Sequence, residues 1–156
     1  MSYLSVLTLE ETKNYLRIDD TLTEDDVRIT SMIKTALSTI ERRTNVLVFA
    51  RSKSYLFEDS CVSVYDYPIN EVTTPTDVDF EEKINYTNYY SRSADDKKLV
   101  LSVGYEVASD VPSEIVECAL EYVKYLYYDA ETNNGTPNKI PMYIKEMIES
   151  QKRFIL

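Results

Sequence analysis

Histidine and tryptophan are absent from this sequence of 156 residues, and glycine occurs only twice, at positions 104 and 135. Without histidine, the chain cannot build Ser-His-Asp or Cys-His nucleophilic pairs, histidine metal sites or imidazole acid–base catalysis. Two isolated glycines cannot form the glycine-rich loops that hold nucleotide phosphates. These absences exclude most common enzyme classes, so we expect no catalytic residues, no metal and no cofactor. Paired carboxylates remain a catalytic alternative, since two suitably separated acids suffice in glycosidases.

Long apolar runs are also missing. No stretch approaches the roughly 20 residues needed to span a bilayer, and the first seven residues lack the basic region and apolar core of a secretory signal. The two cysteines, Cys61 and Cys118, stand far apart without a C-x-x-C spacing, and we interpret them as reduced core thiols. These features predict a soluble, intracellular protein with no membrane contact.

Positive charge is in deficit. The chain holds 17 Lys and Arg against 27 Asp and Glu, which gives a formal net charge of -10. Such a surface repels phosphate and provides no electrostatic basis for wrapping nucleic acid. The acidic stretch 19–26 lacks the spacing and the glycine of a calcium loop, so helix capping and solvation explain it better. Asp77, Asp79, Glu81 and Glu82 form a second acidic run, which we interpret as an exposed loop rather than a two-metal site.

Two helices are predicted near the N-terminus. Thr8 and Glu11 have the spacing of a capping box, which predicts a helix over about 8–16. A cap at Thr23 predicts a second helix over about 23–44, which Asn45 ends in a left-handed conformation. The apolar residues of this second helix recur with helical spacing: Ile29, Met32, Ile33, Ala36, Leu37 and Ile40.

The middle of the chain, about 51–106, has the pattern of β-strands. Segments rich in Tyr, Val, Ile, Leu and Phe alternate there with polar or proline-containing stretches. The expected strands are 54–57, 61–65, 83–90 and 98–105, with turns at 67–70 and 73–76. Gly104 closes the last strand. These segments predict a small, mostly antiparallel sheet.

Two further helices are predicted after the β segment. Pro112 suits a first helical turn, and a second apolar stripe predicts a helix over about 112–128. A polar, turn-rich segment follows over 129–138, and Pro141 opens a final helix over about 141–153. In that last helix Glu149 and Arg153 have the spacing of an ion pair. Phe154, Ile155 and Leu156 end the chain as an apolar tail.

These elements predict an α+β fold that is mainly α, as one domain over residues 1–156. Neither helical stripe can bury itself alone, so the simplest arrangement packs helix 23–44 against helix 112–128. The result is a small helical bundle of two N-terminal and two C-terminal helices. A small antiparallel β segment is inserted between them and covers one end or side of the bundle.

Several segments, in this order and spacing, resemble the head-tail connector (adaptor) family of tailed bacteriophages. The segments are 7–19 (LTLEETKNYLRID), 40–44 (IERRT), 67–69 (YPI) with Val72, 99–105 (LVLSVGY) and 111–112 (VP). The first contains the capping turn and the Leu-Arg-Ile-Asp segment typical of that family. The resemblance extends over most of the chain, apart from about 73–97.

The resemblance implies a structural subunit of the virion neck that is assembled in the host cytoplasm and is not an enzyme. Members of the family form a homo-oligomeric ring of about twelve copies beneath the portal. The ring extends the DNA channel and contacts a downstream neck or tail protein. DNA then passes through the lumen without specific binding.

Two sets of residues are candidates for these roles. The final helix and tail are expected to dock on the portal through Ile148, Arg153, Phe154, Ile155 and Leu156, since a short apolar segment beside basic residues suits docking through buried anchors. The carboxylates of Asp77, Asp79, Glu81 and Glu82 are candidates for lining the channel, where they would repel passing DNA.

Three alternatives remain open on the sequence. The chain could be another neck component, such as a stopper or tail-completion protein. It could be a small acidic regulator or DNA mimic that acts on the host, which would function as a monomer or dimer. The third alternative is a catalytic protein that uses paired carboxylates.

Overall fold

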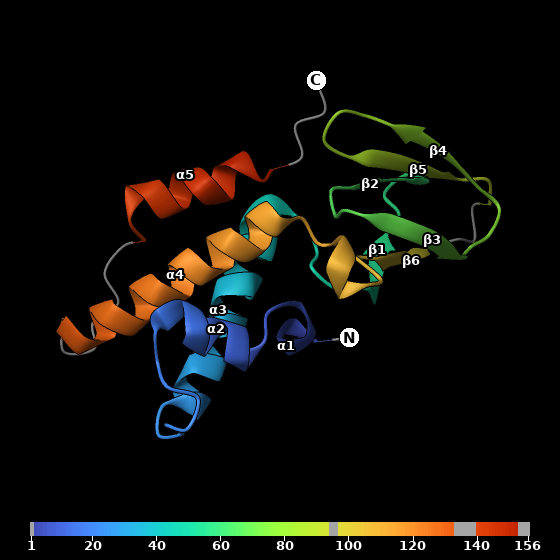
Figure 1. The fold of residues 1–156 in the computed structure, drawn as a ribbon. Coiled ribbons are helices and arrows are strands. Elements are labelled where there is room, and N and C mark those ends of the chain that lie inside the picture. The colour runs from blue at the N-terminus through green and yellow to red at the C-terminus, as the bar shows by residue number, and fades with distance from the viewer. Residues whose placement is uncertain (1, 94–96, 133–139, 153–156) are drawn as a thin grey trace.

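Five α-helices, one 3-10 helix and six strands form the part of the chain that the computed structural model describes, residues 2–93, 97–132 and 140–152. The helices are α1 (Tyr3–Val6), α2 (Leu9–Leu16), α3 (Asp26–Thr44), η1 (Ala108–Asp110, the 3-10 helix), α4 (Ser113–Thr132) and α5 (Met142–Ser150). The strands are β1 (Arg51–Leu56), β2 (Cys61–Val64), β3 (Ile69–Thr74), β4 (Val78–Glu82), β5 (Thr87–Ser91) and β6 (Lys98–Val103). The α-helices lie at one end of the molecule and the strands at the other (Figure 1).

The predicted helix signals at α2 and at the end of α3 are confirmed. The Thr8 hydroxyl accepts a hydrogen bond from the Glu11 backbone N–H at 3.2 Å, and the Thr8 N–H donates to the Glu11 carboxylate at 2.9 Å. This reciprocal capping box lowers the pKa of Glu11. Asn45 ends α3 with a φ of 59°, the left-handed conformation that asparagine tolerates.

The predicted cap of α3 at Thr23 is wrong, since α3 begins at Asp26 with Asp25 at the N-cap position. The buried Lys13 explains the difference. Its ammonium group donates to the carbonyl of Leu22 at 2.6 Å and to the carboxylate of Asp26 at 3.0 Å. These bonds hold the segment before Asp25 in turns beside α2, so the helix starts three residues later.

The strands form two three-stranded antiparallel sheets, in the orders β1-β6-β3 and β2-β5-β4. The expected fold, a mainly helical bundle with a small β insert, is therefore wrong: the α+β class holds, but the β part is a second layered unit. Pro68 and Pro75 predict turns at 67–70 and 73–76. These prolines flank β3 instead of interrupting it, so the ladder of the strand stays intact.

The acidic run at 77–82 was expected to be a loop, but most of it is the edge strand β4. Its side chains are mostly exposed on both faces of the sheet. The sequence therefore lacks the alternation of apolar and polar residues that predicts a half-buried strand. The predicted strand 83–90 begins only at Thr87, because residues 83–86 form the turn between β4 and β5, closed by a hydrogen bond from the Lys83 N–H to the Tyr86 carbonyl at 2.8 Å.

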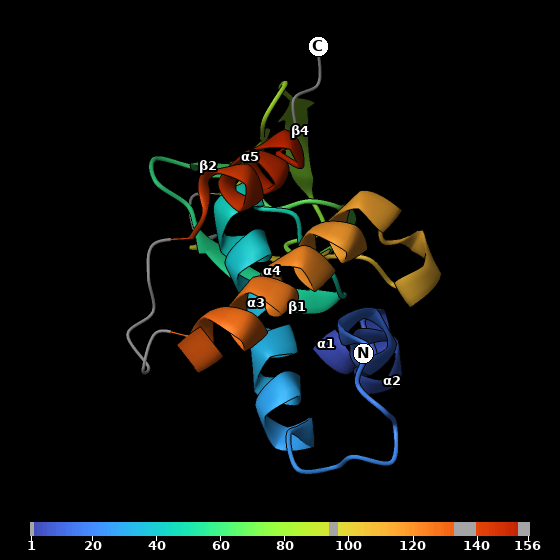
Figure 2. The same cartoon turned by 60° about the vertical axis from the view of Figure 1, so that its left-hand side comes forward.

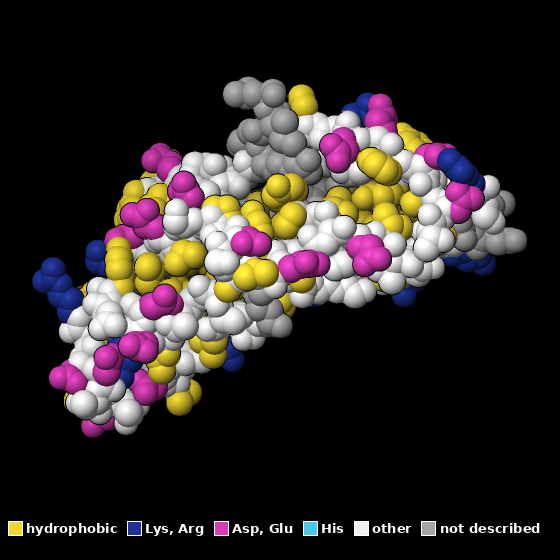
Figure 3. All heavy atoms as spheres, turned by 45° about the vertical axis from the view of Figure 1, so that its right-hand side comes forward, with side chains coloured by type: hydrophobic (Ala, Val, Ile, Leu, Met, Phe, Trp, Pro, Cys, Tyr) yellow, Lys and Arg dark blue, Asp and Glu magenta, His cyan; other side chains and the backbone are white. Residues whose placement is uncertain are grey.

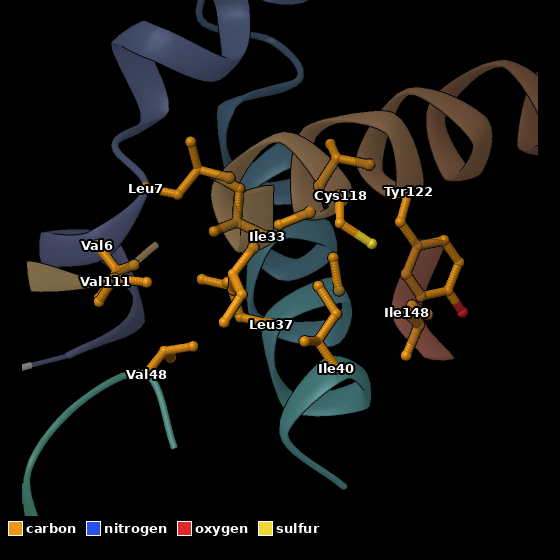
Figure 4. Packing of buried hydrophobic residues seen from close by; sticks show 14 of the residues in the cluster. Val6, Leu7, Ile33, Leu37, Ile40, Val48, Val111, Cys118, Tyr122 and Ile148 are labelled. Atoms are coloured by element: carbon orange, nitrogen blue, oxygen red, sulfur yellow. The ribbon is translucent and has the colours of Figure 1, made fainter. Parts of the chain in front are cut away.

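Two apolar cores hold the molecule together. The larger one contains the buried stripes of α3 and α4, so the predicted packing of these two helices is confirmed. Figure 4 shows Ile33, Leu37 and Ile40 of α3 in this core together with Cys118 and Tyr122 of α4, and Ile148 of α5 beside Tyr122. Helices α1 and α2 lie on one side of α4 and α5 lies on the other (Figures 1 and 2).

The smaller core lies between the two sheets. Its buried members are Leu47, Val64, Tyr89, Leu99, Leu101 and Val103, which come from both sheets and from the segment before β1. In that segment Val46 forms an isolated bridge with Tyr67, and successive side chains point to alternate sides. Val46 and Val48 therefore enter the larger core while Leu47 enters the smaller one, and three consecutive residues join the two cores.

A buried carboxylate fixes the joint between the helices and the sheets. Glu41, on α3, accepts hydrogen bonds from the Tyr3 hydroxyl at 2.7 Å, the Val48 N–H at 2.9 Å and the Arg51 guanidinium at 2.8 Å. Burial, followed by the bond to this carboxylate, raises the pKa of Tyr3. The Arg51 guanidinium also lies 4.8 Å from the centre of the Phe49 ring. The Glu41 side chain thereby links four segments: α3, α1, the segment before β1, and β1 itself.

Gly104 allows the chain to cross close to the same joint. Its φ is 105°, and a Cβ atom at this position would lie 2.2 Å from the carbonyl oxygen of Phe49. Only glycine accommodates both this backbone conformation and this approach. The predicted end of the last strand at Gly104 is confirmed, and its physical reason is the contact with residue 49.

Candidate assembly surfaces

Residues 2–93, 97–132 and 140–152 contain no group of three or more His, Cys, Asp or Glu side chains placed to hold a metal ion. Over the same residues, no helix is long and apolar enough to cross a membrane. Cys118 is a buried core thiol, as predicted, and burial raises its pKa to about 11. Cys61 is partly exposed on β2, so its assignment to the core is wrong.

The four carboxylates predicted to line the channel all lie at or next to the edge strand β4, and all four are exposed. Three of them pair with cations of their own chain. Arg92 donates to Asp77 at 2.8 Å and, through Nε, to Asp79 at 2.9 Å, which lowers the pKa of Asp79.

Lys83 lies 2.5 Å from the Glu81 carboxylate, and this contact lowers the pKa of Glu81. Within the described residues, Glu82 forms no ion pair. The edge therefore carries four carboxylates and two cations, so its local field is weaker than the sequence suggests. Glu82 is the least compensated member of this set.

Exposed apolar side chains lie beside these carboxylates. Phe80, on β4, is 63% exposed, although its ring lies 6.1 Å from that of Tyr89 in the smaller core. It extends the inner face of its sheet to the edge of the molecule. Ile84, in the following turn, is also exposed. An apolar side chain on an open sheet edge is a feature of surfaces that bind another chain.

The residues predicted to dock on the portal fall into two groups. Ile148 is fully buried in the larger core, where it attaches α5 to the bundle, so its side chain has no surface to offer a partner. Arg153, Phe154, Ile155 and Leu156 lie outside the described residues. The predicted pair of Glu149 and Arg153 therefore falls outside them too. Within the described residues, Glu149 pairs with Lys152.

Sequence reasoning missed the exposed apolar residues at the start of α5. Met142 is 71% exposed and Tyr143 is half exposed, while Ile144 and Ile148 bury the opposite side of the helix. The signal was present in the sequence, because two apolar residues directly precede the buried stripe. The buried Glu41 also had a signal, since it lies four residues after Leu37 on the apolar face of α3.

One face of the molecule combines apolar and acidic side chains at its centre, with Lys and Arg side chains mainly at its margins (Figure 3). Surfaces that expose apolar side chains among polar ones suit contacts between proteins. The described residues thus present surfaces that suit contacts with other proteins.

Comparison with solved structures shows proteins of similar fold. One similar chain comes from a virion of a native gene transfer agent particle, with a TM-score of 0.70 and 14% identity. A second comes from the neck of an empty particle, with a TM-score of 0.70 and 15% identity. A third comes from the neck of a native particle, with a TM-score of 0.66 and 14% identity. Each match covers 97% of this chain and 91% of the other. No curated protein matches the chain.

The family of the chain follows from its sequence. A family model for phage gp6-like head-tail connector proteins matches residues 6–148, and the chain belongs to this family. The predicted head-tail connector is thereby confirmed. The match includes the segment 73–97, where the resemblance noted in the sequence could not be followed.

Proposed function

We propose that this protein is a structural subunit of the virion neck, where about twelve copies form a ring between the portal of the DNA-filled head and the tail. Family membership over residues 6–148 is the observation that carries this proposal. The similar chain in the neck of a native gene transfer agent particle belongs to an assembly computed with C12 symmetry, which supports the copy number. The ring extends the DNA channel and contacts a downstream neck or tail protein.

The mass of the assembled protein tests this proposal. Native mass spectrometry or light scattering should detect a ring when the chain is mixed with purified portal rings. The portal is the proposed upper partner, so the ring should co-purify with it. A chain that stays monomeric or dimeric with portal rings at every concentration tested would refute the proposal and favour a host-acting regulator.

We also propose that α5 and the tail after it form the contact with the portal. The exposed Met142 and Tyr143 support an apolar contact on this helix, and the buried Ile148 would hold the helix in place from behind. Apolar anchors surrounded by polar residues supply most of the binding energy in such contacts.

Two variants separate the tail from the helix. Deletion of residues 153–156 should abolish co-purification with portal rings, and Met142→Ser with Tyr143→Ser should weaken it, while both variants keep the unfolding midpoint of the native protein. Glu71→Ser, at an exposed position of β3, is the control on the sheets. A truncated chain that still binds portal rings normally would contradict the role of the tail.

The acidic residues 77, 79, 81 and 82 are proposed to face the DNA channel, where carboxylates repel the phosphates of the passing genome. Glu82→Lys is the sharpest test, because Glu82 has no ion pair among the described residues. Particles that contain this variant should eject DNA more slowly, and more so at low salt. Glu24→Lys, at the opposite end of the molecule, is the control. Unchanged ejection at low salt would refute this role.

A further inference from the structure

Helix α3 turns one whole face away from both cores. The exposed residues recur every three or four positions, opposite the buried stripe: Val27, Ser31, Lys34, Thr35, Ser38 and Arg42. We call these six residues the α3 outer face. It contains no carboxylate, although the chain as a whole has a net charge of -10. Val27 is 84% exposed, the highest value among the large apolar residues of the described chain.

Two of the three hydroxyl groups on this face donate hydrogen bonds within the helix. Thr35 donates to the Ser31 carbonyl at 2.9 Å, and Ser38 donates to the Thr35 carbonyl at 3.1 Å. Because these two hydroxyls already donate a hydrogen bond, they need no further acceptor from water or from a partner. The middle of the face is therefore a narrow surface of small side chains, which another chain can approach closely.

The cations of the α3 outer face are uncompensated. Among the described residues, neither Lys34 nor Arg42 forms an ion pair. By contrast, Arg28 of α3 pairs with Asp25, and Arg51 of β1 pairs with Glu41. Unpaired cations on an otherwise acidic protein are available for a partner that carries the opposite charge.

A surface of the opposite sign lies around η1 and the start of α4. Its exposed carboxylates are Glu106, Asp110, Glu114 and Glu117, which we call the η1–α4 acidic face. No Lys or Arg occurs between Lys98 and Lys124 in the sequence. None of the four carboxylates forms an ion pair within the described residues. Val107, which is 53% exposed, supplies an apolar side chain to this face.

The two faces point away from each other. Helix α4 packs on the buried side of α3, so the α3 outer face looks away from α4. In Figure 2, the gold segment with η1 and the start of α4 lies at the right of the molecule, and α3 lies to its left. One molecule cannot pair these faces with each other, but two molecules can.

We propose that the α3 outer face of one copy binds the η1–α4 acidic face of the next copy around the ring. This inference rests on the proposed ring. A contact between two different faces repeats from copy to copy and closes when the rotation allows it. A two-fold contact of either face with itself would oppose like charges, so the charge pattern also disfavours isolated dimers.

Two charge-reversal variants test this contact. The first, Lys34→Glu with Arg42→Glu, makes the α3 outer face acidic. The second, Glu114→Lys with Glu117→Lys, makes the other face basic. Each variant alone opposes like charges at every contact, so the concentration needed for half assembly should rise by about tenfold or more.

An equal mixture of the two variants should recover assembly. Every contact then joins a native face to a native face, or a reversed face to a reversed face, so the two chains alternate and the ring has an even number of copies. Lys97→Glu with Lys98→Glu is the control for net charge, since both side chains are exposed at the start of β6. Circular dichroism and the unfolding midpoint should match those of the native protein for all variants.

The possible results separate the two proposals. If the native chain forms rings and both variants form them equally well, this contact is refuted while the ring stands. The contact is also refuted if the mixture fails to assemble, or if the first variant forms rings but no longer binds the next neck protein. If the native chain forms no ring with portal rings present, both proposals fail.

Discussion

The buried Glu41 offers the most direct test of how the helices and the sheets are joined. In Glu41→Ala, the buried Val48 N–H loses its acceptor, which costs about 1–3 kcal/mol, and Tyr3 loses a bond to a charged acceptor, which is worth about 1.5–3 kcal/mol. Arg51 is partly exposed and can return to water, so its lost ion pair adds only about 0–1 kcal/mol. The variant no longer buries a carboxylate, which offsets part of the loss.

We expect Glu41→Ala to lower the free energy of unfolding by about 2–4 kcal/mol in total. Glu41→Gln should lose less, about 1–2 kcal/mol, because the amide oxygen can still accept the Val48 N–H. Urea unfolding followed by circular dichroism measures both values. The exposed Glu146→Ala is a matched control and should stay within about 0.5 kcal/mol of the native protein.

A double-mutant cycle separates the contribution of Tyr3 from the rest of this joint. Tyr3→Phe combined with Glu41→Gln should show a coupling energy of about 1 kcal/mol, because the two side chains share a hydrogen bond of 2.7 Å. If Glu41→Ala proves as stable as Glu146→Ala, the four segments are held together by apolar packing alone and the reasoning is wrong.

Three other outcomes are expected. Gly104→Ala should destabilise the protein by about 3 kcal/mol or more in urea unfolding, because it combines a strained φ with the close approach to residue 49. An effect below about 1 kcal/mol would show that the backbone at this joint can relax. Thr8→Ala should cost about 1 kcal/mol through loss of the capping box, and a neutral result would contradict the role of the cap. The hydrogen bond to Glu121 raises the pKa of Tyr15 to about 12, above its unfolded value of 10.0. The contribution of this bond to the free energy of unfolding is therefore complete below pH 10 and is lost as the pH rises toward 12. Tyr15→Phe should therefore flatten the fall in stability over this alkaline range, and an unchanged pH profile would count against the bond.

Local signals in the sequence were reliable where one short segment decides the outcome. The capping box at Thr8, the left-handed stop at Asn45 and the apolar stripes of α3 and α4 all depend on neighbours within a few residues. The carboxylates of β4 were recognised as exposed for the same reason, since a dense acidic run is rarely buried. Their ion pairs could not be foreseen, because Arg92 reaches Asp79 only through the pairing of β4 with β5.

By itself, the sequence determined the helices that pack on each other, the lack of histidine and phosphate-loop chemistry, and the family to which the chain belongs. It did so because apolar periodicity, capping residues and composition act locally or over the whole chain. Only the tertiary structure decided that the β part is two sheets with their own core, that Ile148 is buried, and that Glu41 joins the two parts. These outcomes depend on which distant segments meet, and sequence spacing alone carries no such distances. The positions of the α3 outer face and the η1–α4 acidic face also depend on tertiary structure. Because α3 and α4 pack against each other, their exposed sides point in different directions.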